Sequence, residues 1–272
     1  MKPRIITLLT DFGMKDYYVS AMKGIIASIC PECKVIDITH DVPKFNIARA
    51  SLILWAAYKY FPRGSIHVVV VDPGVGTERK AIAIRTKNYY FIGPNNGVMT
   101  LATTSDGIDE IRIIENRAVM ARKISYTFHG RDIFAPTAAN IAKGFPFEEL
   151  GPKLKENELY PSPLSIPYKK KTKEYIKLKA IYIDDFGNIA LSVEFEDLVK
   201  TLNISVGDSV IVKPLCSSIS YIAKVARTFA EVPKGELALY ENSYGLAELG
   251  IFMGNASRSL NVREGECICI KM

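Results

Sequence analysis

Three polar side chains in the first half of the chain have the types and settings needed to activate a water molecule. Asp72 ends the apolar run Ile66 to Val71, and a Pro-Gly-Val-Gly turn after it can fold Arg79 back towards its carboxylate. His129 lies in an irregular, glycine-containing stretch just before a helical pattern. A carboxylate and an imidazole can share a proton of a bound water, and a buried carboxylate needs a cationic partner. We therefore predict a catalytic set of Asp72, Arg79 and His129, in which Arg79 orients Asp72.

The same residues also have structural interpretations. An ion pair between Asp72 and Arg79 can simply fix a loop, and a lone histidine is more often a hydrogen-bonded structural residue. We assign that structural role to His40 and His67. The pattern leaves open whether Asp72 or His129 is the formal base.

Asp11 follows the first apolar strand, at the carboxyl end where open α/β sheets bind their ligands. A carboxylate at this place can accept hydrogen bonds from both hydroxyls of a ribose. It can also cap the next helix, but Asp16 directly precedes the helical pattern and is the better capping candidate. We therefore predict that Asp11 binds a ligand.

Two polar stretches in the second half of the chain are candidate binding segments. Within the first, Asp184, Phe186 and Asn188 combine a carboxylate, an aromatic face and an amide, a set that suits a purine ring and an amino-acid head group. The second stretch runs from Tyr240 to Glu248, where a plain β-turn over residues 242–245 explains the pattern equally well.

Apolar runs alternate with amphipathic runs through the first half of the chain, which predicts strands alternating with helices in a mainly parallel sheet covered on both faces. Strands are expected at Ile5–Leu9, Val35–Ile38, Ile66–Val71, Ala81–Arg85 and Tyr89–Ile92, and helices at about Tyr17–Ser28, Ile47–Tyr60 and Asp132–Ala142.

The segment from Pro152 to Thr172 loses this periodicity, is rich in proline and ends in a lysine run, so we place a domain linker there. Short strands separated by glycine turns follow, which predicts a small antiparallel barrel or sandwich. These strands are expected at Lys177–Ile183, Ser209–Val212, Leu237–Tyr240 and Cys267–Lys271. The predicted fold is an α/β domain over residues 1–165 and a smaller β domain over residues 173–272.

Composition narrows the class of protein. The formal charge of +6 on 272 residues is spread along the chain, which argues against a nucleic-acid partner. No stretch approaches the roughly 18 apolar residues of a membrane span, so we expect a cytoplasmic protein without a membrane partner. Among five cysteines, Cys30 and Cys33 form a pair that can be redox-active, metal-binding or disulfide-linked, although a helix end with two small residues is the interpretation we favour. We expect no metal site.

The candidate segments, in this order, resemble the S-adenosylmethionine (SAM) hydroxide adenosyltransferase family, the adenosine-forming relatives of SAM-dependent fluorinase and chlorinase. The six collinear anchors are Thr10-Asp11-Phe12-Gly13, Asp72-Pro73-Gly74-Val75-Gly76, Gly93-Pro94-Asn95-Asn96-Gly97, Thr127-Phe128-His129-Gly130-Arg131, Asp185-Phe186-Gly187-Asn188 and Asn242-Ser243-Tyr244-Gly245. Each anchor alone is weak evidence, but all six together span nearly the whole chain.

The resemblance implies hydrolysis of SAM at the ribose C5′ to adenosine and methionine without a cofactor, in a homotrimer that binds SAM between neighbouring subunits. It also implies a larger N-terminal α/β domain and a C-terminal β-barrel. By matching position, Asp11 should hold the ribose hydroxyls, with Phe45 beside the ribose and Asp16 near the methionine part. Asp184 should meet the methionine ammonium, and Phe186 and Asn188 the adenine. The remaining substrate-binding candidates are Thr127, Phe128, Ser243, Tyr244 and Glu248.

Two departures from the halide-using relatives matter. Where those proteins carry an aromatic and a hydroxyl residue around the halide, this chain has Asp72 and the pair His129-Gly130, which favours a polarised water. Tyr244 stands where they carry an arginine, so the partner of the methionine carboxylate stays unassigned. The alternative functions are a SAM-dependent 5′-halogenase and a non-catalytic SAM-binding trimer.

Overall fold

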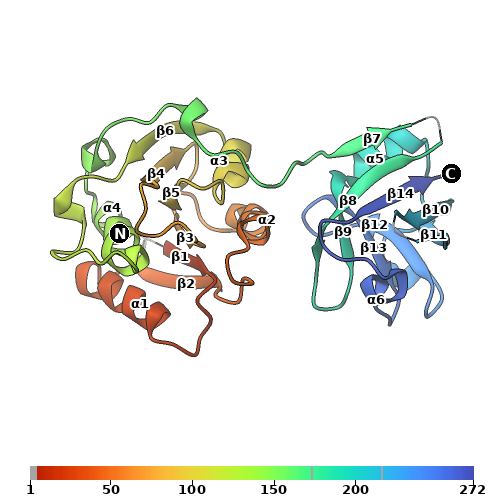
Figure 1. Cartoon of the computed structure of the whole chain (residues 1–272), viewed down its shortest axis with the longest axis horizontal. Coiled ribbons are helices and arrows are strands. Elements are labelled where there is room, and N and C mark those ends of the chain that lie inside the picture. Colours follow the sequence, from red (N-terminus) through yellow and green to blue (C-terminus); the bar gives the residue numbers. More distant parts are fainter. Residues whose placement is uncertain (1–4, 173, 216) are drawn as a thin grey trace. The chain divides into compact units, whose positions relative to one another are not determined.

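A computed structural model describes residues 5–172, 174–215 and 217–272 of the chain. It divides into two compact units (Figure 1), of which the first ends at Leu164 and the second begins at Ser165. Each unit has its own hydrophobic core.

The first unit is built on a six-stranded mixed sheet of order β2-β1-β3-β5-β4-β6. Its strands are β1 (Ile5–Thr10), β2 (Lys34–Thr39), β3 (Ile66–Val70), β4 (Ala81–Thr86), β5 (Tyr90–Pro94) and β6 (Ile108–Ile113). The pairs β1–β2, β1–β3 and β3–β5 are parallel, as predicted, whereas β4 is antiparallel to both of its neighbours. The tight turn between β4 and β5 explains this exception, because only antiparallel strands can be joined by so short a loop.

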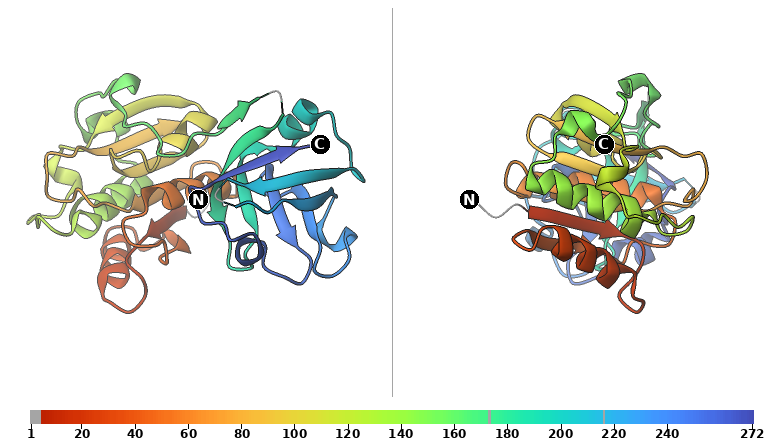
Figure 2. Two further views of the ribbon diagram at one scale, coloured as in Figure 1. Left: turned by 45° about the vertical axis from the view of Figure 1, so that its right-hand side comes forward. Right: turned by 90° about the vertical axis from the view of Figure 1, so that its left-hand side faces the viewer.

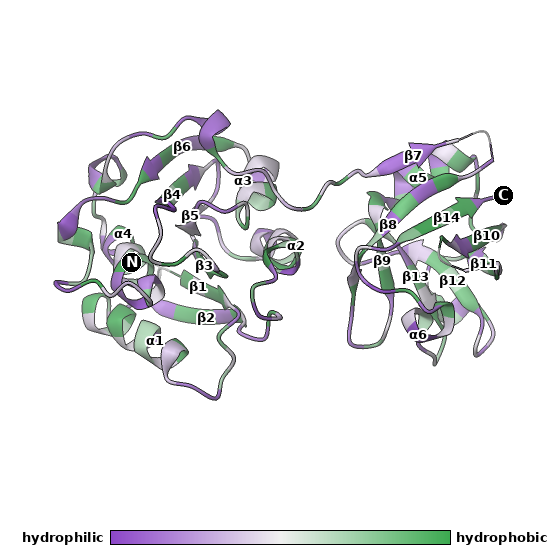
Figure 3. Ribbon diagram, in the orientation of Figure 1, coloured by the Kyte–Doolittle hydropathy of each residue, from purple (hydrophilic) through white to green (hydrophobic). Residues whose placement is uncertain are grey.

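Helices cover both faces of this sheet, as the alternating pattern predicted. They are α1 (Tyr18–Ile29) and α4 (Ala135–Lys143) on one face and α2 (Ile47–Ala57) and α3 (Thr100–Asp106) on the other, and the right-hand view of Figure 2 looks onto α1 and α4. In β1, Ile6 and Leu8 pack on the α1 and α4 side and Leu9 on the α2 side. The central strands β1 and β3 are accordingly hydrophobic along most of their length (Figure 3).

One local prediction about α1 is wrong. The helix begins at Tyr18 and its N-cap is Tyr17, which makes no side-chain capping bond, so Asp16 does not cap it. The helix starts one residue later than the capping role of Asp16 requires, and a carboxylate outside the cap position does not reach the first free amides.

The second unit is a closed barrel of seven strands, ordered β14-β10-β11-β12-β13-β9-β8 and closed by pairing of β14 with β8, to which β7 (Lys169–Lys171) is added at β8. The strands are β8 (Ile176–Ile183), β9 (Ile189–Glu194), β10 (Ser209–Pro214), β11 (Tyr221–Val225), β12 (Leu237–Glu241), β13 (Leu246–Ile251) and β14 (Cys267–Lys271), with helices α5 (Phe195–Leu202) and α6 (Ala256–Leu260). All neighbours in the barrel are antiparallel except β11 and β12. The barrel interpretation therefore holds, with one parallel pair.

The cysteine and histidine predictions have clear outcomes. Cys30 is buried at the C-terminal end of α1 and forms a disulfide with Cys33, so the disulfide alternative is correct and the favoured interpretation, a helix end with two small residues only, is wrong. His40 and His67 are buried structural residues whose Nδ1 atoms hydrogen-bond the Thr10 and Thr7 hydroxyls, each at 2.8 Å.

Candidate functional site

Asp72, Arg79 and His129 form one hydrogen-bonded cluster. The Arg79 Nε donates to Asp72 Oδ1 at 3.1 Å, and its Nη2 contacts both Asp72 Oδ2 and, at 3.0 Å, the Nδ1 of His129. The turn after β3 therefore folds Arg79 back as the sequence predicted. The guanidinium also packs on the Phe134 ring, 5.4 Å from its centroid, which fixes its plane.

Two glycines allow the chain segments of this cluster to approach each other. Gly76 has a φ of +79°, and a Cβ there would lie 2.3 Å from the Tyr126 carbonyl oxygen. A Cβ on Gly130 would lie 3.1 Å from the Met22 sulfur. A side chain at residue 76 would push the Asp72–Arg79 turn away from residue 126. A side chain at residue 130 would push the segment after His129 away from α1.

Burial controls the electrostatics of the cluster. The Asp72 and Arg79 side chains are only 4% and 8% exposed. Burial raises the pKa of Asp72 and outweighs the opposing effects of Arg79 and His129. The pKa of His129 is lowered, first by burial and then by the positive charge of Arg79. Both shifts favour the uncharged forms of Asp72 and His129.

A cavity of about 300 Å³ at the carboxyl end of β1 and β3 places this cluster beside other predicted residues. Asp72 and His129 line it, whereas Arg79 is not among its lining residues. Its walls also include the predicted residues Asp11, Asp16, Phe45, Thr127 and Phe128. The described first unit thus brings seven sequence-predicted residues to one cavity.

Asp11 fixes one rim of this cavity. Its carboxylate, 5% exposed, accepts a hydrogen bond from the Phe45 backbone N–H at 2.8 Å through Oδ2, and its carbonyl oxygen accepts one from Lys44 Nζ. Phe45 has a left-handed backbone, with φ at +64°, and its side chain is 68% exposed. That conformation is unfavourable for a bulky residue, so Asp11 stabilises the position of the aromatic ring.

Aromatic rings supply an apolar wall. The Phe128 ring lies edge-on to Phe12 and Tyr18, with centroids 5.8 and 5.1 Å apart, and Phe128 is buried. Edge-to-face packing of this kind fixes ring positions. The cavity therefore combines a polar cluster with a rigid apolar wall, a setting in which one water can be positioned and desolvated.

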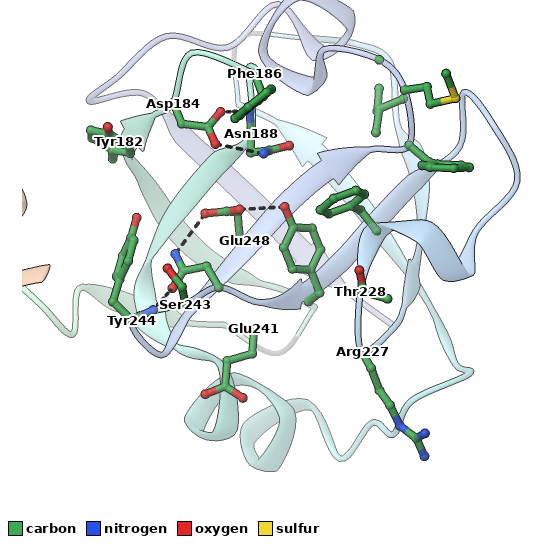
Figure 4. Close-up of a pocket in the computed structure, with 17 residues that line it drawn as sticks. Tyr182, Asp184, Phe186, Asn188, Arg227, Thr228, Glu241, Ser243, Tyr244 and Glu248 are labelled. Atoms are coloured by element: carbon green, nitrogen blue, oxygen red, sulfur yellow. Dashed lines mark hydrogen bonds between the residues drawn. The ribbon is translucent and has the colours of Figure 1, made fainter. Parts of the chain in front are cut away.

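A second cavity, of about 860 Å³, belongs to the second unit and is lined in part by the β8–β9 and β12–β13 turns (Figure 4). It contains the other six predicted residues, which are Asp184, Phe186, Asn188, Ser243, Tyr244 and Glu248. Figure 4 shows Glu248 between the turn of Asp184 and Asn188 and the turn of Ser243 and Tyr244.

The Asp184 carboxylate shapes the first of these turns. It accepts hydrogen bonds from the Asn188 backbone N–H at 2.8 Å and from the Asn188 side-chain amide at 2.9 Å. Phe186, at the tip, is 78% exposed. The turn therefore presents an oriented amide and a free aromatic face.

Glu248 is a buried carboxylate that lines the second cavity. It is 8% exposed and accepts hydrogen bonds from the Tyr240 hydroxyl at 2.6 Å and the Asn242 side-chain amide at 3.0 Å. Burial raises its pKa, with a smaller contribution from the charge of Asp184. Within the described residues no lysine, arginine or histidine forms an ion pair with it. Together with Asp184 it makes this cavity attractive to a cationic group.

Sequence reasoning missed several lining residues. Tyr240 was inside the second candidate segment but was given no role, and it pairs directly with Glu248 across the β12–β13 hairpin. Lys44, next to Phe45, lines the first cavity. Arg227 lines the second cavity, and its surrounding sequence carries no signal for that role.

Two classes of feature were not found in the part of the chain that the structure describes. No helix there is both long and apolar enough to cross a bilayer. No group of three or more His, Cys, Asp or Glu side chains there is arranged to hold a metal ion.

The chain matches two family models, the SAM hydroxide adenosyltransferase N-terminal domain over residues 6–151 and C-terminal domain over residues 178–269. It is 34% identical over 267 residues to an "(R)-S-adenosyl-L-methionine hydrolase" of Salinispora arenicola, covering 96% of this chain and 95% of that protein. Identity to a "Fluorinase" of Actinopolyspora mzabensis is 24% over 287 residues, covering 96% of this chain and 95% of that protein.

A solved structure of an uncharacterized conserved protein from Thermotoga maritima is also similar, with a TM-score of 0.91 at 39% identity, covering 98% of this chain and all of that one (100%). Together, the two family models account for most of both units, including both cavities. The chain therefore belongs to the SAM hydroxide adenosyltransferase family.

Proposed function

We propose that this protein hydrolyses SAM at the ribose C5′, releasing adenosine and L-methionine. The observation that carries the proposal is the cluster of Asp72, Arg79 and His129 beside the first cavity of a chain in this family. The name of the Salinispora relative specifies the (R) sulfonium diastereomer, and we propose the same preference for this protein.

In this reaction only the nucleophile needs to be activated. The sulfonium makes C5′ electrophilic and departs as a neutral thioether, so the leaving group needs no acid. The nucleophile is a water that must lie in line with the C5′–S bond, and such positioning requires a water oxygen about 3 to 3.5 Å from C5′. We propose that no cofactor takes part.

The cluster of Asp72, Arg79 and His129 positions and activates this water. Asp72 and His129 flank the water, and Arg79 orients the aspartate through two hydrogen bonds. Attack by an incipient hydroxide on a cation disperses charge, which the apolar wall around Phe128 favours.

The other residues bind the substrate in this proposal. Asp11 holds the ribose hydroxyls, Phe45 and the neighbouring wall enclose the ribose, and Asp16 lies near the methionine part. In the barrel, Phe186 and Asn188 contact the adenine, while Asp184 receives the ammonium. Five further residues are assigned to the substrate site only because they line one of the cavities, and no substrate atom is proposed for them: Thr127, Phe128, Ser243, Tyr244 and Glu248.

We further propose a homotrimer in which SAM lies between neighbouring subunits. Large apolar side chains are exposed at both cavities, including Phe45 at the first and, at the second, Phe186 (78%) and Met253 (72%). Each cavity holds only part of the ligand set, so a complete site needs both. A cytoplasmic location and the lack of a nucleic-acid partner remain predictions from composition.

A product assay tests the proposed function. The protein is incubated with (R)-SAM and with (S)-SAM, with and without chloride, and the nucleosides are separated by chromatography. We expect adenosine, formed faster from (R)-SAM and unaffected by chloride. A 5′-chloro-nucleoside would identify a halogenase instead, and intact SAM together with measurable binding would identify a non-catalytic SAM-binding protein.

Asp11→Ala is expected to raise KM for SAM far more than it lowers kcat, because a ribose contact made equally in the ground and transition states is uniform binding. Steady-state kinetics and calorimetric titration with SAM measure the two effects.

Asp11→Asn and Asp41→Ala are the controls. The asparagine variant retains an oxygen for the Phe45 N–H, so it tests the ribose contact while the support of Phe45 is kept. Asp41 is an exposed aspartate outside the cavity, so its substitution controls for the loss of an unrelated carboxylate. Unchanged SAM affinity in Asp11→Ala would show that the ribose is held elsewhere.

A further inference from the structure

We infer that His129 acts as a neutral hydrogen-bond donor, through Nε2–H, to the attacking water, and that Asp72 alone accepts the water's proton. This inference rests on the proposed function and sharpens it, since sequence reasoning left the formal base open between these two residues.

The contact between Arg79 and His129 carries the argument. The Arg79 Nη2 lies 3.0 Å from His129 Nδ1, within hydrogen-bond distance. An arginine guanidinium has donors and no acceptor, so Nδ1 must be the acceptor in this pair. An Nδ1 that accepts carries no proton, and the proton of the neutral imidazole is then on Nε2.

The same guanidinium nitrogen binds both partners. Nη2 has two hydrogens, one for Asp72 Oδ2 and one for His129 Nδ1. Arg79 therefore fixes the carboxylate and the imidazole tautomer together. Its plane is in turn held on the Phe134 ring, so neither contact is free to rotate.

The charged groups around His129 keep it neutral. A proton on Nδ1 would face the Arg79 N–H and add a positive charge beside the guanidinium. The negative charges of Asp72 and Asp132 favour a protonated His129, but each carboxylate already has partners. Asp72 is bound to Arg79. Asp132 accepts hydrogen bonds from Arg131 Nε at 2.7 Å and from the Ser125 N–H at 2.8 Å. Burial and Arg79 prevail, and the pKa of His129 is lowered.

This tautomer assigns the proton transfer. Since Nδ1 faces Arg79, Nε2 is the ring nitrogen left for the cavity that His129 lines, and its N–H has no lone pair to take a proton. Its two bonds from Arg79 and one from the Gly74 backbone N–H leave the Asp72 carboxylate a lone pair for the water's proton. The water receives a hydrogen bond from His129 and gives its proton to Asp72, as its oxygen bonds to C5′. The C5′–S electron pair leaves with the thioether sulfur of methionine.

Nitrogen NMR tests the tautomer without any turnover. The chain has only three histidines, so ¹⁵N-histidine labelling with one substitution for each assigns every signal. We expect His129 in the substrate-free protein to be neutral at pH 7 and protonated at Nε2. A proton on Nδ1, or an imidazolium at pH 7, would overturn the inference, whether or not the protein hydrolyses SAM.

Two variants test the role in catalysis. His129→Gln keeps a side-chain N–H but cannot take up a proton near neutral pH, whereas His129→Ala removes both functions. We expect Ala to lower kcat by ~10²-fold or more and Gln to retain activity within about tenfold of the wild type. Equal loss in both variants, with normal SAM binding and thermal stability, would contradict the donor role.

The pH profile separates the two candidate bases. If Asp72 is the base, kcat falls as the pH is lowered through the raised pKa of Asp72, and this acid limb persists in His129→Gln. If His129 is the base, the limb disappears in that variant. Loss of the limb would therefore overturn the assignment of Asp72, while leaving the hydrolase function intact.

Discussion

Asp72→Asn is expected to lower kcat for SAM hydrolysis by ~10²- to 10⁴-fold, the usual effect of removing a positioned acid-base group, while SAM affinity changes by only a few-fold. The asparagine keeps the size of the side chain and one oxygen for Arg79, but its amide cannot accept the water's proton. In the proposed mechanism Asp72 faces the attacking water and contacts neither the adenine nor the methionine. Single-turnover kinetics combined with a binding titration separate the two effects.

A matched control is available in the same region. Asp132 is also buried, with a side chain 3% exposed, and is also paired with an arginine, but it is not among the residues lining the cavity. Asp132→Asn should therefore act mainly on stability: it should lower the free energy of unfolding and change kcat little. If Asp72→Asn shows that same pattern, losing thermal stability and SAM affinity together, then Asp72 fixes a loop and the water is activated elsewhere.

Mixing two variants that each have a low kcat/KM is expected to restore kcat/KM if SAM lies between subunits of a trimer. One variant carries Asp11→Ala in the first unit, and the other carries Phe186→Ala and Asn188→Ala in the barrel. If each site is shared between neighbours, about one site in three of every trimer that contains both variants combines an intact first unit with an intact barrel. Co-expression with two different affinity tags isolates the mixed trimers, and kcat/KM measures the recovery.

The control pairs two variants of the same unit. Asp11→Ala mixed with Asp72→Asn leaves every first unit defective, so no recovery is expected from that pair. If neither mixture regains activity, the complete site lies within one subunit. An active monomer in light scattering would exclude the trimer.

The sequence by itself determined the regular part of the fold. The apolar runs of β1 and β3 can be buried only between two layers of helices, and the structure places them there. Elements with a weak apolar pattern were missed. Strand β6 is at the edge of its sheet and carries three charged residues in six positions, and α3 is a short helix of seven residues rich in threonine.

The sequence also determined which residues to consider for chemistry. Thirteen of the fourteen predicted site residues line one of the two cavities, and the fourteenth, Arg79, binds Asp72 and His129, which line the first. Local patterns were enough for Asp11 and Asp72, which follow strand ends, whereas Asp16 and Phe45 were assigned from the family resemblance, and the roles of all these residues stay predictions.

Only the tertiary structure decided how these residues are paired. The disulfide of Cys30 and Cys33 was one of several alternatives until their geometry was seen. Closure of the barrel depends on β14 pairing with β8, whose partner residues lie 88 to 94 positions earlier in the chain. The same holds for the contact of Arg79 with His129, across fifty residues, which sets the imidazole tautomer. A local pattern gives the type and position of a side chain, but its protonation and hydrogen-bond direction depend on neighbours that only folding brings close.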